Sequence, residues 1–412
     1  MAAHTDFLIE RPPACERTRP IRVCHFTTAH TQLKSRSFHR QCLPLAASGF
    51  EVRYVAPVGM PGSCGGVCFV SLPTPSHRLR RFVGLPELLR TLLRQQANVY
   101  YFQDPQLFPA ALMLETIFRK RVVYDAYEDF PAVAARHRSI PRYLRPIAAL
   151  TLAGIERLAV RLFDGVITAD PLTLARLARH GKSKKLVFYN FPNLDFFPPP
   201  RPRAKFFDIV YRGGLSERAG TFVLLEALRI LAAQHEIGAR PKLPRLLLIG
   251  YFDDAAAEKI LRERILTFGL QSCVEIRGRL AHECMADALS KAHIGVCPLQ
   301  DVPKFRTNIP VKVFESWACG LPVVASDLPP IRPFFRNGYA GLLFPPGNAG
   351  ELASAIAWLL DRPQVAAEMG GRGREIVEKR LNNAGETSKL RRFLSAFAPE
   401  PVSTRPSGSS VA

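Results

Sequence analysis

The chain has 412 residues, of which 47% are hydrophobic and 22% charged, a balance typical of a folded globular protein and not of a disordered or fibrous one. A length of 412 residues exceeds what one hydrophobic core usually supports, so the sequence favours two domains. The 56 Lys and Arg residues against 35 Asp and Glu residues leave a net charge of +21. This surplus indicates an anionic partner such as nucleic acid, acidic phospholipid or a phosphorylated small molecule.

The apolar stretches of the sequence are too short to span a bilayer. A membrane-spanning helix needs roughly 18 to 20 uncharged residues, and charged residues such as Arg142 and Arg145 interrupt each candidate. The first 20 residues lack the continuous apolar segment of a secretory signal, so we expect the protein in the cytoplasm.

The cysteines do not form a regular framework. Cys24, Cys297 and Cys319 lie inside apolar runs and are predicted to be buried, reduced thiols. Cys64 and Cys68 lie four residues apart in a Gly-rich segment, but no second Cys or His pair accompanies them, as a structural zinc site requires. We therefore predict no metal site.

From residue 20 onward, short β-branched or aromatic runs alternate with longer helical patterns, which is typical of parallel βαβ units. The strands predicted in the first half are Ile21 to Phe26, Glu51 to Ala56, Val99 to Phe102, Arg121 to Asp125, Val166 to Thr168 and Leu186 to Tyr189. The strands predicted in the second half are Asp208 to Gly213, Arg245 to Gly250, Val274 to Gly278, Ile294 to Cys297, Pro322 to Ala325 and Gly341 to Phe344. The pattern predicts an α/β fold with two successive parallel sheets.

The two halves are separated by a segment that contains three consecutive prolines, Pro198 to Pro200. Proline fixes φ and removes a backbone donor, so neither a helix nor a central strand can continue there. The ends of the chain are rich in Pro, Ser and charge, which is typical of disorder. We predict a disordered tail at 1–19, a first domain at 20–193, a linker at 194–206, a second domain at 207–380, a helix at 381–397 that returns to the first domain, and a tail at 398–412.

The segment Ile309 to Asp327 (IPVKVFESWACGLPVVASD) has the pattern of a short helix that leads into a buried strand. Lys312 and Glu315 are three residues apart and share one helix face. The helix N-terminus together with Lys312 could hold a diphosphate, and Glu315 could accept hydrogen bonds from two ribose hydroxyls. The alternative is a solvated ion pair, which contributes little to stability.

This segment resembles a motif of the family 4 (group 1) glycosyltransferases, which have the GT-B fold. Further segments resemble motifs of the same family in the same order: YYFQDPQLFPAAL, VVYDAYEDFP, FDGVITAD and YRGGLSERAGTFVLLEAL. The resemblance extends over residues 20 to 395 and implies two Rossmann-like domains that face each other across a cleft. The first domain would bind the acceptor and the second the nucleotide-sugar.

The resemblance implies a set of donor-binding residues in the second domain. Glu315 would contact the ribose and Lys312 the phosphates. Thr307 stands where many relatives carry an acid that contacts the donor sugar. The remaining implied donor-site residues are Gly213, Gly214, Arg218 and Asn308. Arg218 would neutralise the leaving diphosphate, although Ala219 stands where Lys or Arg is common; the glycines alone are equally compatible with a tight turn.

In the first domain, the resemblance implies cleft residues from three segments. His30 and Arg36 match positions of a loop that binds acceptor or donor phosphate, although His30 alone is equally compatible with a surface loop. Two histidines of the family are replaced, one by Tyr127 and the other by Gln103.

Asp104, Glu128 and Tyr127 are the predicted catalytic residues. Tyr127 can donate a hydrogen bond to a sugar hydroxyl. Asp104 and Glu128 lie at strand ends, where open α/β sheets bind ligands, or they cap the helices that follow.

The function implied by the resemblance is transfer of a sugar, with retention of configuration, from a nucleotide-sugar to a lipid-linked or glycan acceptor in bacterial surface polysaccharide synthesis. No cofactor is expected beyond the donor substrate. A catalytically silent homologue that serves as a binding or scaffold subunit is the alternative. Nucleic acid is not an expected partner, because no nucleic-acid-binding motif accompanies the charge.

Two Arg-rich segments, 77–94 and 136–161, intersperse arginine with apolar residues at helical spacing. We expect the apolar residues to pack on the sheet and the arginines to contact anionic lipid on the inner face of the plasma membrane.

Overall fold

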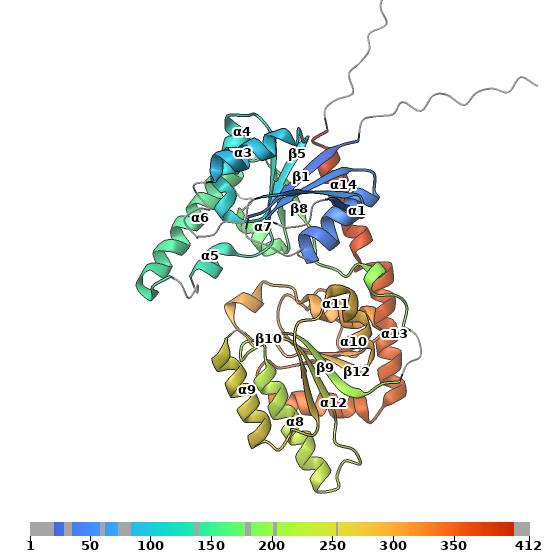
Figure 1. The fold of residues 1–412 in the computed structure, drawn as a ribbon. Coiled ribbons are helices and arrows are strands. Elements are labelled where there is room, and N and C mark those ends of the chain that lie inside the picture. The colour runs from blue at the N-terminus through green and yellow to red at the C-terminus, as the bar shows by residue number, and fades with distance from the viewer. Residues whose placement is uncertain are drawn as a thin grey trace, which may run out of the picture.

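The computed structural model describes residues 20–28, 35–57, 62–72, 84–135, 140–177, 183–200, 204–252 and 254–398. These residues form two α/β domains, one above the other in Figure 1.

The first domain is built on an eight-stranded sheet with the order β3-β4-β2-β1-β5-β6-β7-β8. Its strands are β1 (Arg22–Phe26), β2 (Glu51–Ala56), β3 (Gly62–Cys64), β4 (Val67–Ser71), β5 (Val99–Phe102), β6 (Arg121–Ala126), β7 (Gly165–Thr168) and β8 (Lys184–Val187). Its helices and helical turns are η1 (Ser35–Cys42), α1 (Leu43–Ala47), α3 (Leu85–Arg94), η2 (Pro105–Leu107), α4 (Phe108–Thr116), α5 (Phe130–Ala134), η3 (Arg142–Leu144), α6 (Arg145–Leu162) and α7 (Pro171–Leu177). Every strand pair is parallel except β3–β4.

The second domain has a six-stranded parallel sheet with the order β11-β10-β9-β12-β13-β14. Its strands are β9 (Phe207–Leu215), β10 (Leu246–Phe252), β11 (Val274–Arg277), β12 (Ala292–Cys297), β13 (Val323–Ser326) and β14 (Gly341–Phe344). Its helices and turns are α8 (Thr221–Glu236), α9 (Ala255–Thr267), η6 (His282–Cys284), α10 (Met285–Ser290), η7 (Pro303–Arg306), α11 (Val311–Ala318), α12 (Ala349–Leu360) and α13 (Pro363–Lys379). The predicted two-sheet α/β fold is thus confirmed.

The chain crosses between the domains twice. The segment with the turn η5 (Leu194–Phe196) joins β8 to β9. The last helix, α14 (Asn383–Ser395), then lies beside α1 and β8 of the first domain (Figure 1). Its side chains Leu390 and Leu394 are fully buried in the first domain's core, so the end of the chain stabilises the domain in which the chain begins.

The hairpin β3–β4 is absent from the sequence prediction, which treated its cysteines as part of a loop. Gly65 and Gly66 form its turn, with φ values of +56° and +80°, and Gly-Gly is a sequence favoured in two-residue hairpin turns. Cys24, Cys297 and Cys319 are buried free thiols, as predicted.

The two Arg-rich segments differ in how their apolar residues are placed. In α3, Leu88, Leu89 and Leu92 are buried, as expected, whereas residues 77–83 lie outside the described part. In α6 the packing prediction is wrong for one whole face: Ile147 and Leu150 are 61% and 75% exposed. The helix packs on its neighbours through another face, which contains Ala159 and Val160, and its outer apolar side chains are largely exposed to solvent. Within the described ranges, no helix has the length and apolar character needed to cross a bilayer.

Candidate functional site

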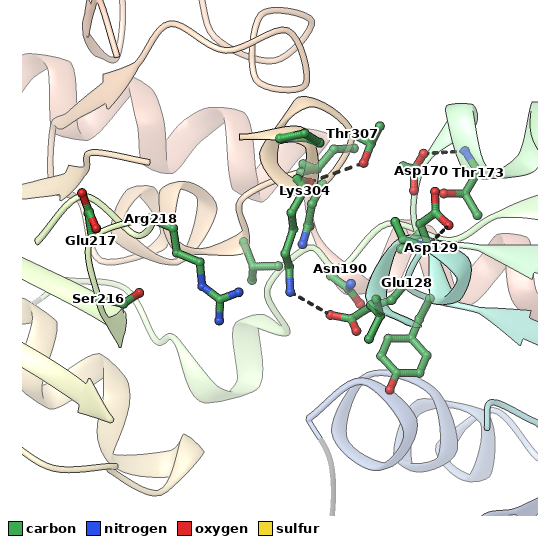
Figure 2. A pocket seen from close by; sticks show the side chains of 18 of the residues that line it. Glu128, Asp129, Asp170, Thr173, Asn190, Ser216, Glu217, Arg218, Lys304 and Thr307 are labelled. Carbon is green, nitrogen blue, oxygen red and sulfur yellow. Dashed lines mark hydrogen bonds and ion pairs between the residues drawn. The ribbon is translucent and has the colours of Figure 1, made fainter. Parts of the chain in front are cut away.

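A cavity of about 920 Å³ lies between the two domains and takes its walls from both. Most of its polar lining side chains, several of which are labelled in Figure 2, follow the carboxyl ends of parallel strands of the two sheets. They are Tyr127, Glu128 and Asp129 after β6, Asp170 after β7, Asn190 after β8, Ser216, Glu217 and Arg218 after β9, and Lys304, Thr307 and Asn308 after β12. Ligands of open parallel sheets bind at this edge, so the topology places the site where small-molecule chemistry is expected.

The first domain contributes three carboxylates to the cavity lining: Glu128, Asp129 and Asp170. Two of them, the aspartates, bind backbone N–H groups of the helices that follow them. Asp129 accepts a hydrogen bond from the backbone N–H of Ala132 at 3.2 Å, and Asp170 accepts one from Thr173 at 2.7 Å. These aspartates therefore cap α5 and α7. The capping role considered for Glu128 belongs to its neighbour, and the Glu128 side chain points into the cavity (Figure 2).

Tyr127 lines the cavity beside Glu128. Burial, reinforced by the negative charges of Glu128 and Asp104, raises the pKa of the Tyr127 phenol above its ordinary value. The phenol therefore stays protonated near neutral pH and can donate a hydrogen bond to a ligand.

The second domain presents Ser216, Glu217 and Arg218 on the turn between β9 and α8. Gly220 closes this turn with φ of +80°, and a Cβ there would lie 1.6 Å from the carbonyl oxygen of Pro298. Only glycine fits this position. The Arg218 guanidinium on this turn points toward the cavity (Figure 2).

Lys304 reaches across the cavity from η7. Its ammonium donates a hydrogen bond to Glu128 Oε1 at 3.3 Å, so the contact joins the two domains (Figure 2). Among the described residues that line the cavity, Lys304 and Arg218 are the basic side chains, and acidic side chains stand at five positions. Those acidic residues are Glu128, Asp129, Asp170, Glu217 and Asp254.

Lys312 and Glu315 do not line the cavity. The Lys312 ammonium donates a hydrogen bond to the Tyr211 hydroxyl at 3.0 Å, and that hydroxyl donates to the carbonyl of Gly214 at 2.8 Å. Gly213 has φ of +147°, and a Cβ there would lie 2.8 Å from the Lys312 ammonium. Gly213 and Gly214 also lie outside the lining. Lys312 thus supports the glycine turn, and its contact with phosphate stays a prediction.

Glu315 is fully buried in an ion cluster between the domains. Its Oε1 accepts a hydrogen bond from Arg40 of η1 at 3.0 Å. Its Oε2 lies 2.7 Å from Arg212 Nη2, an ion pair without the alignment of a hydrogen bond. Burial lowers the pKa of Arg40 to about 10, so it is charged at neutral pH. Because both carboxylate oxygens already have cationic partners here, ribose binding by Glu315 stays a prediction.

Arg36 and Gln103 do not line the cavity, and both bind the buried carboxylate of Asp125, so their role as cleft residues stays a prediction. Arg36 contacts its two oxygens at 2.7 and 2.9 Å, and Gln103 donates to it at 2.7 Å. Burial alone would raise the pKa of Asp125, but the Arg36 charge and the hydrogen bonds outweigh it and hold this pKa below its ordinary value. Arg36 also donates to Asn190 Oδ1 at 2.7 Å, so it orients one side chain of the cavity wall.

Asp104, another predicted residue of the first domain, does not line the cavity. Asp104 is buried and accepts a hydrogen bond from the Thr27 hydroxyl, so it lies behind the cavity wall. His30 lies outside the described residues. Within the described ranges, no group of three or more His, Cys, Asp or Glu side chains is arranged to hold a metal ion.

Three residues with evident roles are missing from the sequence-based set: Lys304, Asn190 and Arg40. Lys304 precedes the Thr307-Asn308 pair by only three residues, so its closeness to the recognised motif was the available signal. Arg40 follows Arg36 by four residues, the spacing of a shared helix face. Its partner Glu315 is 275 residues away, and no local pattern indicates that contact.

Comparisons with known proteins agree with this geometry. The family described as "Glycosyl transferases group 1" matches residues 207–362. The amylovoran biosynthesis glycosyltransferase AmsK of Erwinia amylovora is 32% identical over 143 residues, which are 34% of this chain and 33% of AmsK. The matched segment thus spans about a third of that relative.

Solved structures match over nearly the whole chain. Sucrose-phosphate synthase from Thermosynechococcus elongatus superposes with a TM-score of 0.71 at 20% identity, covering 92% of this chain and 100% of the other. Anabaena HepE, solved in complex with UDP-glucose, gives a TM-score of 0.68 at 15% identity with coverages of 91% and 100%. The GT-B fold expected from the resemblance is therefore confirmed for the chain as a whole, and its second domain, over residues 207–362, matches the family of group 1 glycosyltransferases.

Proposed function

We propose that this protein is a retaining glycosyltransferase that moves a sugar from a nucleotide-sugar to a lipid-linked or glycan acceptor in bacterial surface polysaccharide synthesis. The observation that carries the proposal is the interdomain cavity of about 920 Å³, lined by polar side chains at the carboxyl edges of both sheets. The family match of the second domain and the presence of UDP-glucose in HepE support a nucleotide-sugar as the donor. The name of AmsK supports the polysaccharide pathway.

In the proposed reaction, the acceptor hydroxyl attacks the anomeric carbon on the face from which the nucleoside diphosphate departs. The bond from the anomeric carbon to the acceptor oxygen forms as the bond to the phosphate oxygen breaks, and the acceptor's proton moves to that phosphate oxygen. Arg218, beside the N-terminus of α8, is placed to stabilise the developing charge. Tyr127 and Glu128 are placed to orient the sugar by hydrogen bonds.

The alternative is a silent homologue that binds a nucleotide without turnover. Two observations favour it. Ala219, at a position where the family often has Lys or Arg, is buried in the hydrophobic core of the second domain. Glu315, which the family resemblance implies for ribose binding, already accepts a hydrogen bond from Arg40. Nucleotide binding without sugar transfer or hydrolysis would support this alternative.

A thermal-shift panel of UDP-, GDP-, ADP- and dTDP-sugars tests the proposal, because ligand binding raises apparent stability by mass action. The donor that stabilises the protein is then assayed for hydrolysis and transfer. Arg218→Ala should lower turnover by at least tenfold, whereas the matched control Arg229→Ala on the exposed side of α8, where Arg229 pairs with Glu226, should not. If no nucleotide-sugar stabilises the protein, the proposal is wrong.

We further propose that the outer face of α6 docks the protein on an anionic bilayer. Leu158 and Leu162 continue the exposed apolar face of Ile147 and Leu150. Arg157 lies exposed on the same helix, and the acidic residue of α6, Glu156, is buried and turned inward. A second copy of this face would bring arginine against arginine, whereas lipid headgroups supply the opposite charge. Because α6 packs on the cavity-lining α5, docking here would bring a lipid-linked acceptor close to the site.

Vesicle flotation tests this surface. Wild-type protein should float with phosphatidylglycerol-containing vesicles, and the double variant Leu150→Ser/Leu158→Ser should float several-fold less. Ile237→Ser removes an equally exposed apolar side chain (80%) from the second domain and should have no effect. Equal flotation of all three proteins would contradict α6 docking, and concentration-dependent dimerisation lost in the double variant would assign the face to a second copy.

A further inference from the structure

Lys304 is a charged side chain of the cavity wall that has no role in the proposed reaction, and it contacts Glu128. The contact joins the domains at 3.3 Å, and the two side chains are 36% and 33% exposed. No further partner of either side chain is recorded among the described residues. An ion pair this open to water contributes little to stability, so a ligand with stronger charge can replace either partner.

The charges of the cavity lining indicate that a bound diphosphate needs Lys304 as a second cationic partner beside Arg218. Among the described lining residues, three of the five acidic side chains cap helices, namely Asp129, Asp170 and Asp254. Glu128 and Glu217 remain to oppose an anion, and Arg218 is the basic side chain besides Lys304. Lys304 is the second basic side chain of the lining and lies on η7, immediately before Thr307 and Asn308. Its flexible stem lets the ammonium turn from one anion to another without movement of the backbone.

We infer that Lys304 exchanges partners when the donor binds: it leaves Glu128 and pairs with the donor's diphosphate. This inference rests on the proposed nucleotide-sugar site. The exchange also frees the Glu128 carboxylate, which then accepts hydrogen bonds from a sugar hydroxyl. Lys304 is thus a binding residue for the leaving group, and Glu128 competes with the diphosphate for it.

Calorimetric titration of UDP, GDP, ADP and dTDP into the full-length protein tests the exchange, because competition predicts opposite signs for the two partners. Lys304→Gln should weaken binding of the preferred nucleotide by about tenfold, as loss of one charge contact to phosphate does. Glu128→Gln should strengthen it several-fold, because the competing anion is gone. The double variant should resemble Lys304→Gln, and Lys304→Arg should retain most of the affinity.

Arg306→Gln is the matched control, because Arg306 belongs to the same turn, pairs with Asp301 and does not line the cavity. Its affinity should equal that of the wild type. If Lys304→Gln and Glu128→Gln both weaken binding, the contact merely holds the walls together and the inference is wrong. Unchanged affinity in Lys304→Gln would also overturn it. Failure of the wild type to bind any of the four nucleotides would instead contradict the proposed function itself, and with it this inference.

Discussion

Within the described ranges, an arginine–carboxylate contact and a lysine–carboxylate contact join the domains, and they differ in their access to water. The contact between Arg40 and Glu315 is buried, with side-chain exposures of 6% and 0%, whereas Lys304 and Glu128 are about one-third exposed. A buried charge that loses its partner is strongly unfavourable, but water readily replaces the partner of an exposed charge. The same chemistry therefore serves two purposes here: one contact fixes the domain interface, and the other remains available to a ligand.

Removal of the buried carboxylate should have the largest effect on stability. Glu315→Ala leaves Arg40 and Arg212 as neighbouring cations without their shared anion, and we expect a loss of about 3–5 kcal/mol in the free energy of unfolding. Urea denaturation measures it. Asp301→Ala, which breaks an exposed pair on η7, is the control and should cost less than about 1 kcal/mol. Similar values for both variants would show that burial does not distinguish the two kinds of contact.

A smaller loss is expected from Asp125→Asn, which keeps a hydrogen-bonding side chain but removes the charge that faces Arg36. We expect a cost of about 2 kcal/mol, the range of a charge-assisted hydrogen bond. Because Arg36 also holds Asn190, the variant should also disturb the cavity wall. Urea denaturation combined with nucleotide titration checks both effects, and wild-type values in both would contradict the role assigned to Arg36.

The interface should also respond to acid. Burial, with Arg40 nearby, lowers the pKa of His282 to about 4, and burial lowers that of its ring neighbour His39 as well. The unfolded chain takes up protons near pH 6.5, whereas the folded protein takes them up only at lower pH. The contribution of these two neutral histidines to the free energy of unfolding is therefore fully present above about pH 6.5, and it is lost as the pH falls toward 4. Melting temperatures from pH 7 to 4 should decrease less steeply in His282→Asn; parallel curves would contradict this assignment.

The smallest effect on stability is predicted for the exposed interdomain pair. Lys304→Ala should change the free energy of unfolding by less than about 1 kcal/mol, even though it weakens nucleotide binding. The two measurements together separate a ligand-binding role from a structural one. A destabilisation comparable to that of Glu315→Ala would place both contacts in the same structural class.

The fold was predictable from local patterns, because strand and helix periodicities depend on neighbouring residues. The family resemblance, and not periodicity, indicated Tyr127, Glu128 and Arg218, and the structure places all three in the cavity wall after the carboxyl ends of parallel strands. The Gly65-Gly66 pair is a signal for a hairpin turn, but no strands were predicted on either side of it.

The placement of Glu315 was not predictable, because it depends on Arg40 from the other domain. Helical spacing indicates that Lys312 and Glu315 share one face of α11. It does not indicate that Arg40 of the first domain packs against that face. The exposed apolar face of α6 was missed for a related reason, since periodicity identifies an amphipathic helix but does not say which face finds a partner.

The central claim is that the interdomain cavity binds the sugar nucleotide, and hydrogen–deuterium exchange tests it most directly. The protein is compared with and without the nucleotide-sugar that gives the largest thermal shift. The account predicts slower exchange in two segments from opposite walls, 127–134 after β6 and 303–309 before α11. Protection confined to other surfaces, or to neither wall of the cavity, would contradict it.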